Sequence, residues 1–110
     1  MADPPGDRPT ISTHLLDLGA GAPAAGVAVT LTRLGDGMVF AAQRTDADGR
    51  IGDLLAGATL ETGGYELAFA LGETGFFRRA AVAFVVEDSS RSYHIPLLVS
   101  PFGLSTYRGS

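Results

Sequence analysis

The two histidines of this chain, His14 and His94, are its best candidates for proton transfer at neutral pH. A neutral imidazole has a pKa of about 6.5 and can accept a proton from water under these conditions. The chain has 110 residues and no cysteine, which excludes disulfides, thiolate metal sites and a cysteine nucleophile. A lone histidine in a strand is more often structural than catalytic, so both residues need support from their surroundings.

Alternation of apolar and polar residues places both histidines on the more polar face of a strand. Tyr93 and Ile95 share one face of the later segment, and His94 lies on the other. In the earlier segment, His14 shares a face with Ser12. Because neither imidazole points to the apolar side, we expect that replacing either one leaves the core intact.

A third candidate, Arg50, ends the turn segment TDADGR at residues 45–50. Its guanidinium stays charged and offers planar donors to a carbonyl or a developing oxyanion. The segment would also fit an ordinary solvated turn whose aspartates bond to their own backbone. It lacks the downstream glutamate of a calcium loop, and two histidines without cysteine do not complete a usual zinc site. We therefore expect no metal and no other cofactor.

The last four residues combine an aromatic ring, a cation, a glycine and a hydroxyl: Tyr107, Arg108, Gly109 and Ser110. The tyrosine can bury its ring, and the glycine permits a close approach that a Cβ would block. This composition predicts a docked tail. The alternative is an ordinary last strand whose terminal residues have no functional role.

Short apolar segments separated by turn residues must position these groups. Turn signals recur roughly every 8–12 residues, which favours an all-β fold, a two-sheet antiparallel β-sandwich of about eight strands. The dense apolar run at 80–87 is predicted to be a central strand. Residues 71–79 fit a short helix or a tight loop equally well.

Composition and charge exclude several classes of function. The net charge is −4, which disfavours nucleic acid as a partner. All eight basic residues are arginine, so lysine chemistry is ruled out. The sequence lacks a signal peptide and an apolar run of transmembrane length. We expect a cytoplasmic protein without membrane contact, in which residues 1–10 form a flexible leader and residues 11–110 one domain.

Four segments resemble the 5-hydroxyisourate hydrolases, enzymes of the transthyretin-like family. They stand in the family's order and approximate spacing, and together they span nearly the whole chain. The C-terminal Tyr-Arg-Gly-Ser is the family's signature. Two features depart from the pattern, namely Leu104 where many members carry an aromatic residue and the leader through Pro9. The segments are ISTHLLD (11–17), TDADGR (45–50), YHIPLLVSP (93–101) and STYRGS (105–110).

The resemblance implies a cofactor-free cyclic amide hydrolase of urate breakdown. Its substrate would be 5-hydroxyisourate and its product 2-oxo-4-hydroxy-4-carboxy-5-ureidoimidazoline. By the resemblance, His14, Arg50 and His94 are catalytic and the tail 107–110 lines the same site. It further implies one short helix within 71–79 and a homotetramer whose active sites open into a channel between dimers.

Two readings of a different class remain beside the enzyme. Segments 26–31, 45–50 and 64–67 also look like a carboxypeptidase-regulatory-like binding module, although this leaves His94 and the tail unexplained. The other is a transthyretin-like carrier of hydrophobic ligands, which retention of His14, Arg50 and His94 disfavours. The sequence leaves open which histidine is the general base.

Overall fold

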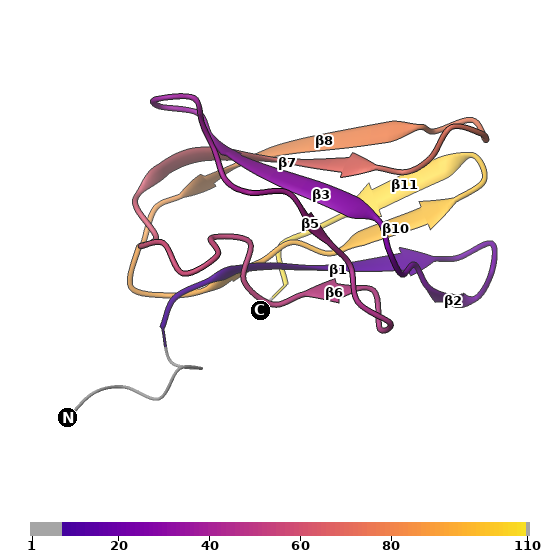
Figure 1. Ribbon diagram of the computed structural model, residues 1–110, viewed down its shortest axis with the longest axis horizontal. Coiled ribbons are helices and arrows are strands. Elements are labelled where there is room, and N and C mark those ends of the chain that lie inside the picture. Colours follow the sequence, from indigo (N-terminus) through magenta and orange to yellow (C-terminus); the bar gives the residue numbers. More distant parts are fainter. Residues whose placement is uncertain (1–7, 110) are drawn as a thin grey trace.

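The structure, a computed structural model, describes residues 8–109. These residues form two β-sheets packed face to face (Figure 1). In the first sheet the order is β11-β10-β1-β2, and β6 and β9 also pair with β1. Its strands are β1 (Ile11–Asp17), β2 (Ala22–Pro23), β6 (Arg50–Ile51), β9 (Tyr93–His94), β10 (Leu97–Ser100) and β11 (Gly103–Thr106). The predicted leader lies outside the described residues except for its last three positions, 8–10.

The second sheet has the order β4-β3-β7-β8, with β5 also paired to β3. It is antiparallel throughout, whereas in the first sheet β1 runs parallel to both β9 and β10. Its strands are β3 (Ala28–Arg33), β4 (Met38–Val39), β5 (Gln43–Arg44), β7 (Gly63–Ala70) and β8 (Arg79–Val86). The predicted all-β sandwich of two mainly antiparallel sheets is confirmed.

The core lies between the two sheets and follows the predicted alternation. In β1, positions 11, 13 and 15 are buried and positions 12, 14 and 16 are partly exposed. β7 alternates in the same way, with Tyr65, Leu67 and Phe69 fully buried. This period of two is what a strand with one face toward a core requires. It leaves the outward face of β1 free to carry polar side chains.

The short helix expected within 71–79 is not formed, and no helix occurs in the described residues. β7 and β8 pair along their whole length, from Gly63 opposite Val86 to Ala70 opposite Arg79. Only residues 71–78 are left to reverse the chain, and they form a tight loop. Gly72 (φ 144°) and Gly75 (φ 92°) in this loop have positive φ angles that interrupt a right-handed helix. With no helix at all in residues 8–109, none could cross a membrane.

The apolar run at 80–87 forms an outermost strand, β8, and not the predicted central one. Continuous apolar runs are typical of strands buried on both faces, which was the basis of the prediction. In the single chain, Ala81, Ala83 and Val85 are exposed on the outward face of β8. The local pattern of apolar residues cannot distinguish a strand face that the same chain covers from one that it leaves exposed.

Candidate active site

Strand pairing brings Arg50 directly beside His14. β6 is antiparallel to β1, and the register places Arg50 opposite His14 and Ile51 opposite Thr13. Residues directly opposite each other in a sheet project from the same face. Ile51 and Thr13 are buried, so Arg50 and His14 occupy the outward face. Figure 1 shows β6 beside β1.

The turn before β6 explains why Arg50 is held at this register. The Asp46 carboxylate accepts hydrogen bonds from the backbone N–H groups of Asp48 and Arg50, each at 2.9 Å. Gly49 has a φ of 76°, and a Cβ there would lie 2.4 Å from the carbonyl oxygen of Leu15. Only glycine can therefore fit this position, where its carbonyl accepts the Leu15 N–H at 2.7 Å. The turn therefore packs on β1 and places Arg50 beside His14.

Thr45 anchors the other end of this turn. Its side chain is buried, and its hydroxyl donates to the carbonyl of Ala24 at 2.7 Å. The same oxygen accepts the N–H of Val27 at 2.9 Å. A buried polar group satisfied in this way stabilises one chain path over others, because losing either partner would leave an unsatisfied group. The TDADGR segment is thus fixed at both ends.

His94 reaches the same face from the other side of β1. β9 runs parallel to β1, with Ser12 opposite His94 in the register. The N–H of Ile95 donates to the Ser12 carbonyl at 2.9 Å, and the buried Thr13 hydroxyl donates to the Ile95 carbonyl at 2.6 Å. β1 is therefore the central strand of the site, with Arg50 on one neighbouring strand and His94 on the other.

Gly109 covers His94 from the C-terminal side. It forms an isolated antiparallel bridge with His94, and its N–H donates to the His94 carbonyl at 2.7 Å. A Cβ at Gly109 would lie 2.6 Å from Cδ2 of the imidazole. The predicted docked tail is present in this sense, and Ser110, the last predicted site residue, lies outside the described residues.

The structure does not bring Tyr107 and Arg108 to the histidines. The Arg108 guanidinium lies over the Tyr93 ring, 4.9 Å from its centroid, and Tyr107 is exposed. Both residues line a cavity of about 210 Å³ between the edges of β8 and β11, together with Val82 and Val85. Tyr93 and His94 point to opposite faces of the sheet. Arg108 therefore contacts the face away from the histidines, whereas the next residue, Gly109, lies against His94.

Burial and nearby positive charge favour the neutral form of His94. Partial burial, followed by the charges of Arg50 and His14, lowers the pKa of the His94 imidazole below its ordinary value. A neutral ring at neutral pH can accept a proton, which is the requirement for a general base. The same nearby arginine can stabilise negative charge that develops on a bound carbonyl oxygen.

Sequence reasoning missed one residue of this cluster, Ser12. Its hydroxyl lies 2.8 Å from Nδ1 of His94. The only signal in the sequence was that Ser12 shares a face with His14, which says nothing about a partner 82 positions away.

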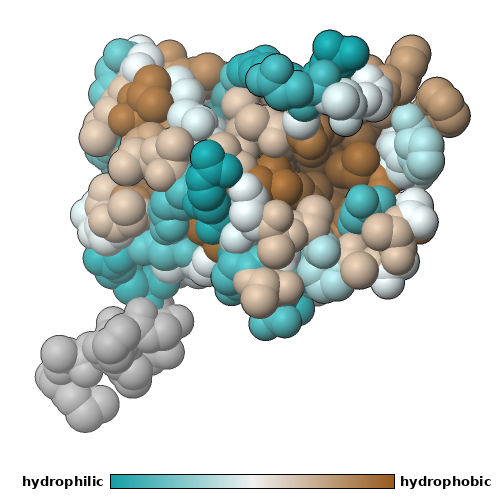
Figure 2. Space-filling view, turned by 45° about the vertical axis from the view of Figure 1, so that its right-hand side comes forward, coloured by the Kyte–Doolittle hydropathy of each residue, from teal (hydrophilic) through white to brown (hydrophobic). Residues whose placement is uncertain are grey.

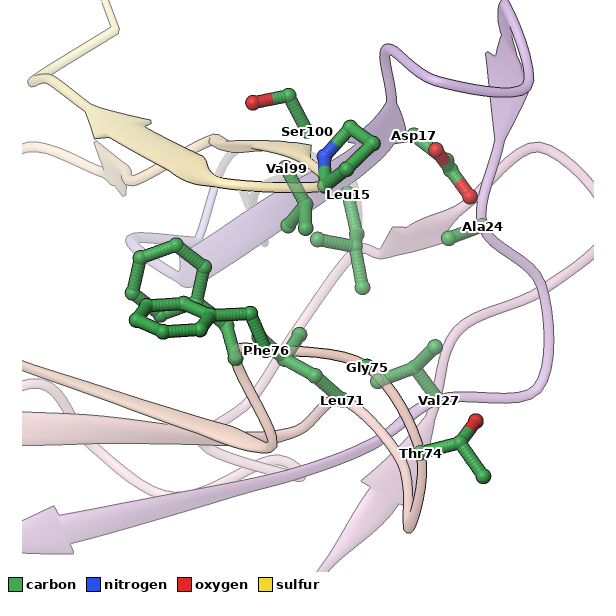
Figure 3. Close-up of a pocket in the computed structure, with 12 residues that line it drawn as sticks. Leu15, Asp17, Ala24, Val27, Leu71, Thr74, Gly75, Phe76, Val99 and Ser100 are labelled. Carbon is green, nitrogen blue, oxygen red and sulfur yellow. The ribbon is translucent and has the colours of Figure 1, made fainter.

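A second cavity, at the far end of β1, holds none of the predicted site residues. It has a volume of about 250 Å³ and is lined mainly by apolar side chains, with Asp17 as its one charged residue. Figure 3 shows Leu15 and Val99 of the first sheet facing Leu71 of the opposite layer. This end of the molecule is turned forward in Figure 2, where apolar residues line a hollow. Without an acid, base and oxyanion donor together, this cavity lacks the composition of a hydrolytic site.

No group of three or more metal-ligating side chains gathers anywhere in residues 8–109. The cluster at the site consists of two imidazoles and a guanidinium, and a guanidinium repels a cation. The donor set of these residues therefore does not fit a metal ion.

Comparison with known proteins gives a consistent result over nearly the whole chain. Residues 11–109 match the HIUase/Transthyretin family. A protein of Caulobacter vibrioides named 5-hydroxyisourate hydrolase is 43% identical over 113 aligned residues, covering 91% of this chain and 97% of that protein.

Solved structures agree with the sequence comparison. The 5-hydroxyisourate hydrolase of Klebsiella pneumoniae has a TM-score of 0.80 at 39% identity, covering 93% of this chain and 99% of that one. Transthyretin of Sparus aurata has a TM-score of 0.79 at 29% identity, covering 93% of this chain and 97% of that one. The fold is thus shared by an enzyme and by a protein named only as transthyretin.

Proposed function

The chain belongs to the HIUase/Transthyretin family, and we propose that it hydrolyses 5-hydroxyisourate in urate breakdown, with His14, Arg50 and His94 as its catalytic residues. The observation that carries this proposal is the strand register around β1. It gathers two imidazoles and one guanidinium, from three separate segments of the chain, on one face of the first sheet.

The reaction requires three catalytic roles from these residues. One imidazole removes a proton from water as the oxygen attacks the lactam carbonyl. Arg50 donates hydrogen bonds to the oxyanion of the tetrahedral intermediate. When the C–N bond breaks, a proton passes to the departing ring nitrogen, and the carbonyl carbon becomes the carboxylate of 2-oxo-4-hydroxy-4-carboxy-5-ureidoimidazoline. The two histidines share the base and acid roles, and the chemistry involves no cofactor.

The tail completes the site in this proposal. Gly109 closes one side of His94, while Arg108 holds the tail in place through its contact with the Tyr93 ring. We therefore assign Gly109, with Ser110 beside it in sequence, to the lining of the site, and Tyr107 and Arg108 to its support.

The relatives favour an enzyme over a carrier. Proteins named 5-hydroxyisourate hydrolase, from several bacteria, are 38–43% identical to this chain over at least 91% of its length. The transthyretin structures share 29% and 30% identity, and one of them was solved with thyroxine. The carboxypeptidase-regulatory-like alternative does not account for the match through residue 109.

We further propose a homotetramer in the cytoplasm, with active sites at the channel between dimers. The outermost strands β8 and β11 both border the cavity at the open side of the sandwich. Unpaired strand edges with exposed apolar residues such as Val85 are favourable sites for pairing between chains. Light scattering coupled to size-exclusion chromatography would measure the subunit number, and a monomer would contradict this part.

The deciding experiment adds purified protein to freshly generated 5-hydroxyisourate and follows its ultraviolet absorbance. We expect a decay much faster than the spontaneous reaction, in proportion to protein concentration. The double variant of both histidines to Ala is the matched control. No acceleration over the spontaneous rate would refute the enzymatic function, and full activity in the control would refute the assigned residues.

A further inference from the structure

Within residues 8–109, the hydroxyl of Ser12 is the one side-chain group that is hydrogen-bonded to the His94 ring. Its Oγ lies 2.8 Å from Nδ1. No described residue has a hydrogen bond to the other ring nitrogen, Nε2. We propose that Ser12 is a positioning residue for His94, holding Nδ1 so that Nε2 is presented to water and substrate; this rests on the hydrolytic function proposed above.

The backbone holds Ser12 firmly enough for this task. Ser12 lies opposite His94 in the parallel pairing of β1 and β9, and its carbonyl accepts the Ile95 N–H at 2.9 Å. Its neighbours on either side, Ile11 and Thr13, are buried in the core at 0% and 1% exposure. The Cβ of Ser12 is therefore held in place beside the ring, and only rotation about χ1 can move its hydroxyl away.

A hydroxyl is chemically suited to a histidine that cycles between two protonation states. When Nε2 exchanges the proton, Nδ1 carries a proton both in the neutral base and in the imidazolium, and the Ser12 oxygen can accept that N–H in both states. A carboxylate in the same place would favour the charged imidazolium. Ser12 holds the ring in both states without adding charge, and so it orients His94 without stabilising the form that cannot accept a proton.

The enzymatic test compares Ser12→Ala and Ser12→Thr with Ser100→Ala. Ser100 is a matched control, a partly buried serine of the same sheet whose hydroxyl bonds to the Gly103 carbonyl at 3.2 Å. We expect Ser12→Ala to lower kcat about tenfold with little change in KM, in keeping with one lost hydrogen bond. Ser12→Thr should restore most of the rate, and Ser100→Ala should match the wild type.

Ring nitrogen NMR gives a readout that a purely structural serine would not change. The chain has only two histidines, so a His14→Asn variant identifies the signals of His94. The separation of the Nδ1 and Nε2 shifts reports the tautomer, and we expect Ser12→Ala to alter it while Ser100→Ala does not. Should Ser12→Ala fold poorly, Ser12→Cys keeps the side-chain size with much weaker hydrogen bonding.

Two results would overturn the proposal. One is an unchanged kcat or unchanged His94 shifts in Ser12→Ala or Ser12→Cys. The other is a loss of activity that follows loss of folded protein and that Ser12→Thr does not restore. If the wild type itself fails to hydrolyse 5-hydroxyisourate, the function is refuted, whereas the nitrogen shifts still test the contact between Ser12 and His94.

Discussion

Replacing Gly109 with alanine tests the contact between the tail and the catalytic cluster. The new Cβ would stand 2.6 Å from Cδ2 of His94, whereas ordinary contact begins at 3.4 Å. The gap must therefore widen by about 0.8 Å, the difference between these two distances. The backbone angle of Gly109 is one that alanine can adopt, so the cost is steric and falls on this contact.

Either response to the clash disturbs His94. If the imidazole turns away, its contact with Ser12 is lost, and if the tail lifts, the 2.7 Å bond to the His94 carbonyl breaks. A displacement of roughly 1 Å at a catalytic group can cost about 10²-fold in rate. We expect kcat to fall between about 10- and 100-fold. Stability should fall by only about 1 kcal/mol, because at most one backbone hydrogen bond is lost.

The assay is the absorbance decay of 5-hydroxyisourate, with thermal unfolding measured on the same samples. Gly35→Ala is the control, because a Cβ at Gly35 meets no atom within 4 Å and its φ is not positive. That variant should retain the activity of the wild type. A Gly109→Ala protein that folds normally and turns over at the wild-type rate would show that the tail does not bear on His94.

Four further predictions concern the same site. His14→Ala and His94→Ala should each lower kcat by roughly 10²–10⁴ while far-ultraviolet circular dichroism stays that of a folded sandwich; near-full activity in a folded variant removes that residue from the mechanism. Activity should fall as pH drops through a midpoint below the usual imidazole value of about 6.5, because burial and the Arg50 charge lower the pKa of His94 and its neutral form persists further into acid; a rate that does not fall on acidification while the protein stays folded would argue against a histidine base. Exhaustive chelation should leave the rate unchanged, and a loss restored by zinc would overturn the cofactor-free proposal. Deletion of residues 108–110 should abolish most activity with a small drop in melting temperature, and a fully active truncated protein would exclude the tail from the site.

Local sequence patterns were sufficient for several structural features. The alternation around His14 and His94 correctly predicted their faces, because a strand places successive side chains on opposite sides whatever it pairs with. The TDADGR segment was recognised as a turn, because aspartate side chains bond to nearby backbone groups. The segments that matched the family also indicated which residues to examine, but not how they meet.

The tertiary structure alone decided which segments are neighbours. Ser12 and His94 are 82 positions apart, and their contact depends on β1 running parallel to β9. The β7–β8 connection is limited to residues 71–78 by the full-length pairing of those strands, and the positive φ angles of Gly72 and Gly75 make it a loop where a helix was expected. The outermost position of β8 likewise follows from sheet order. Register and order are set by packing across the whole chain, so the period of a single segment carries no information about them.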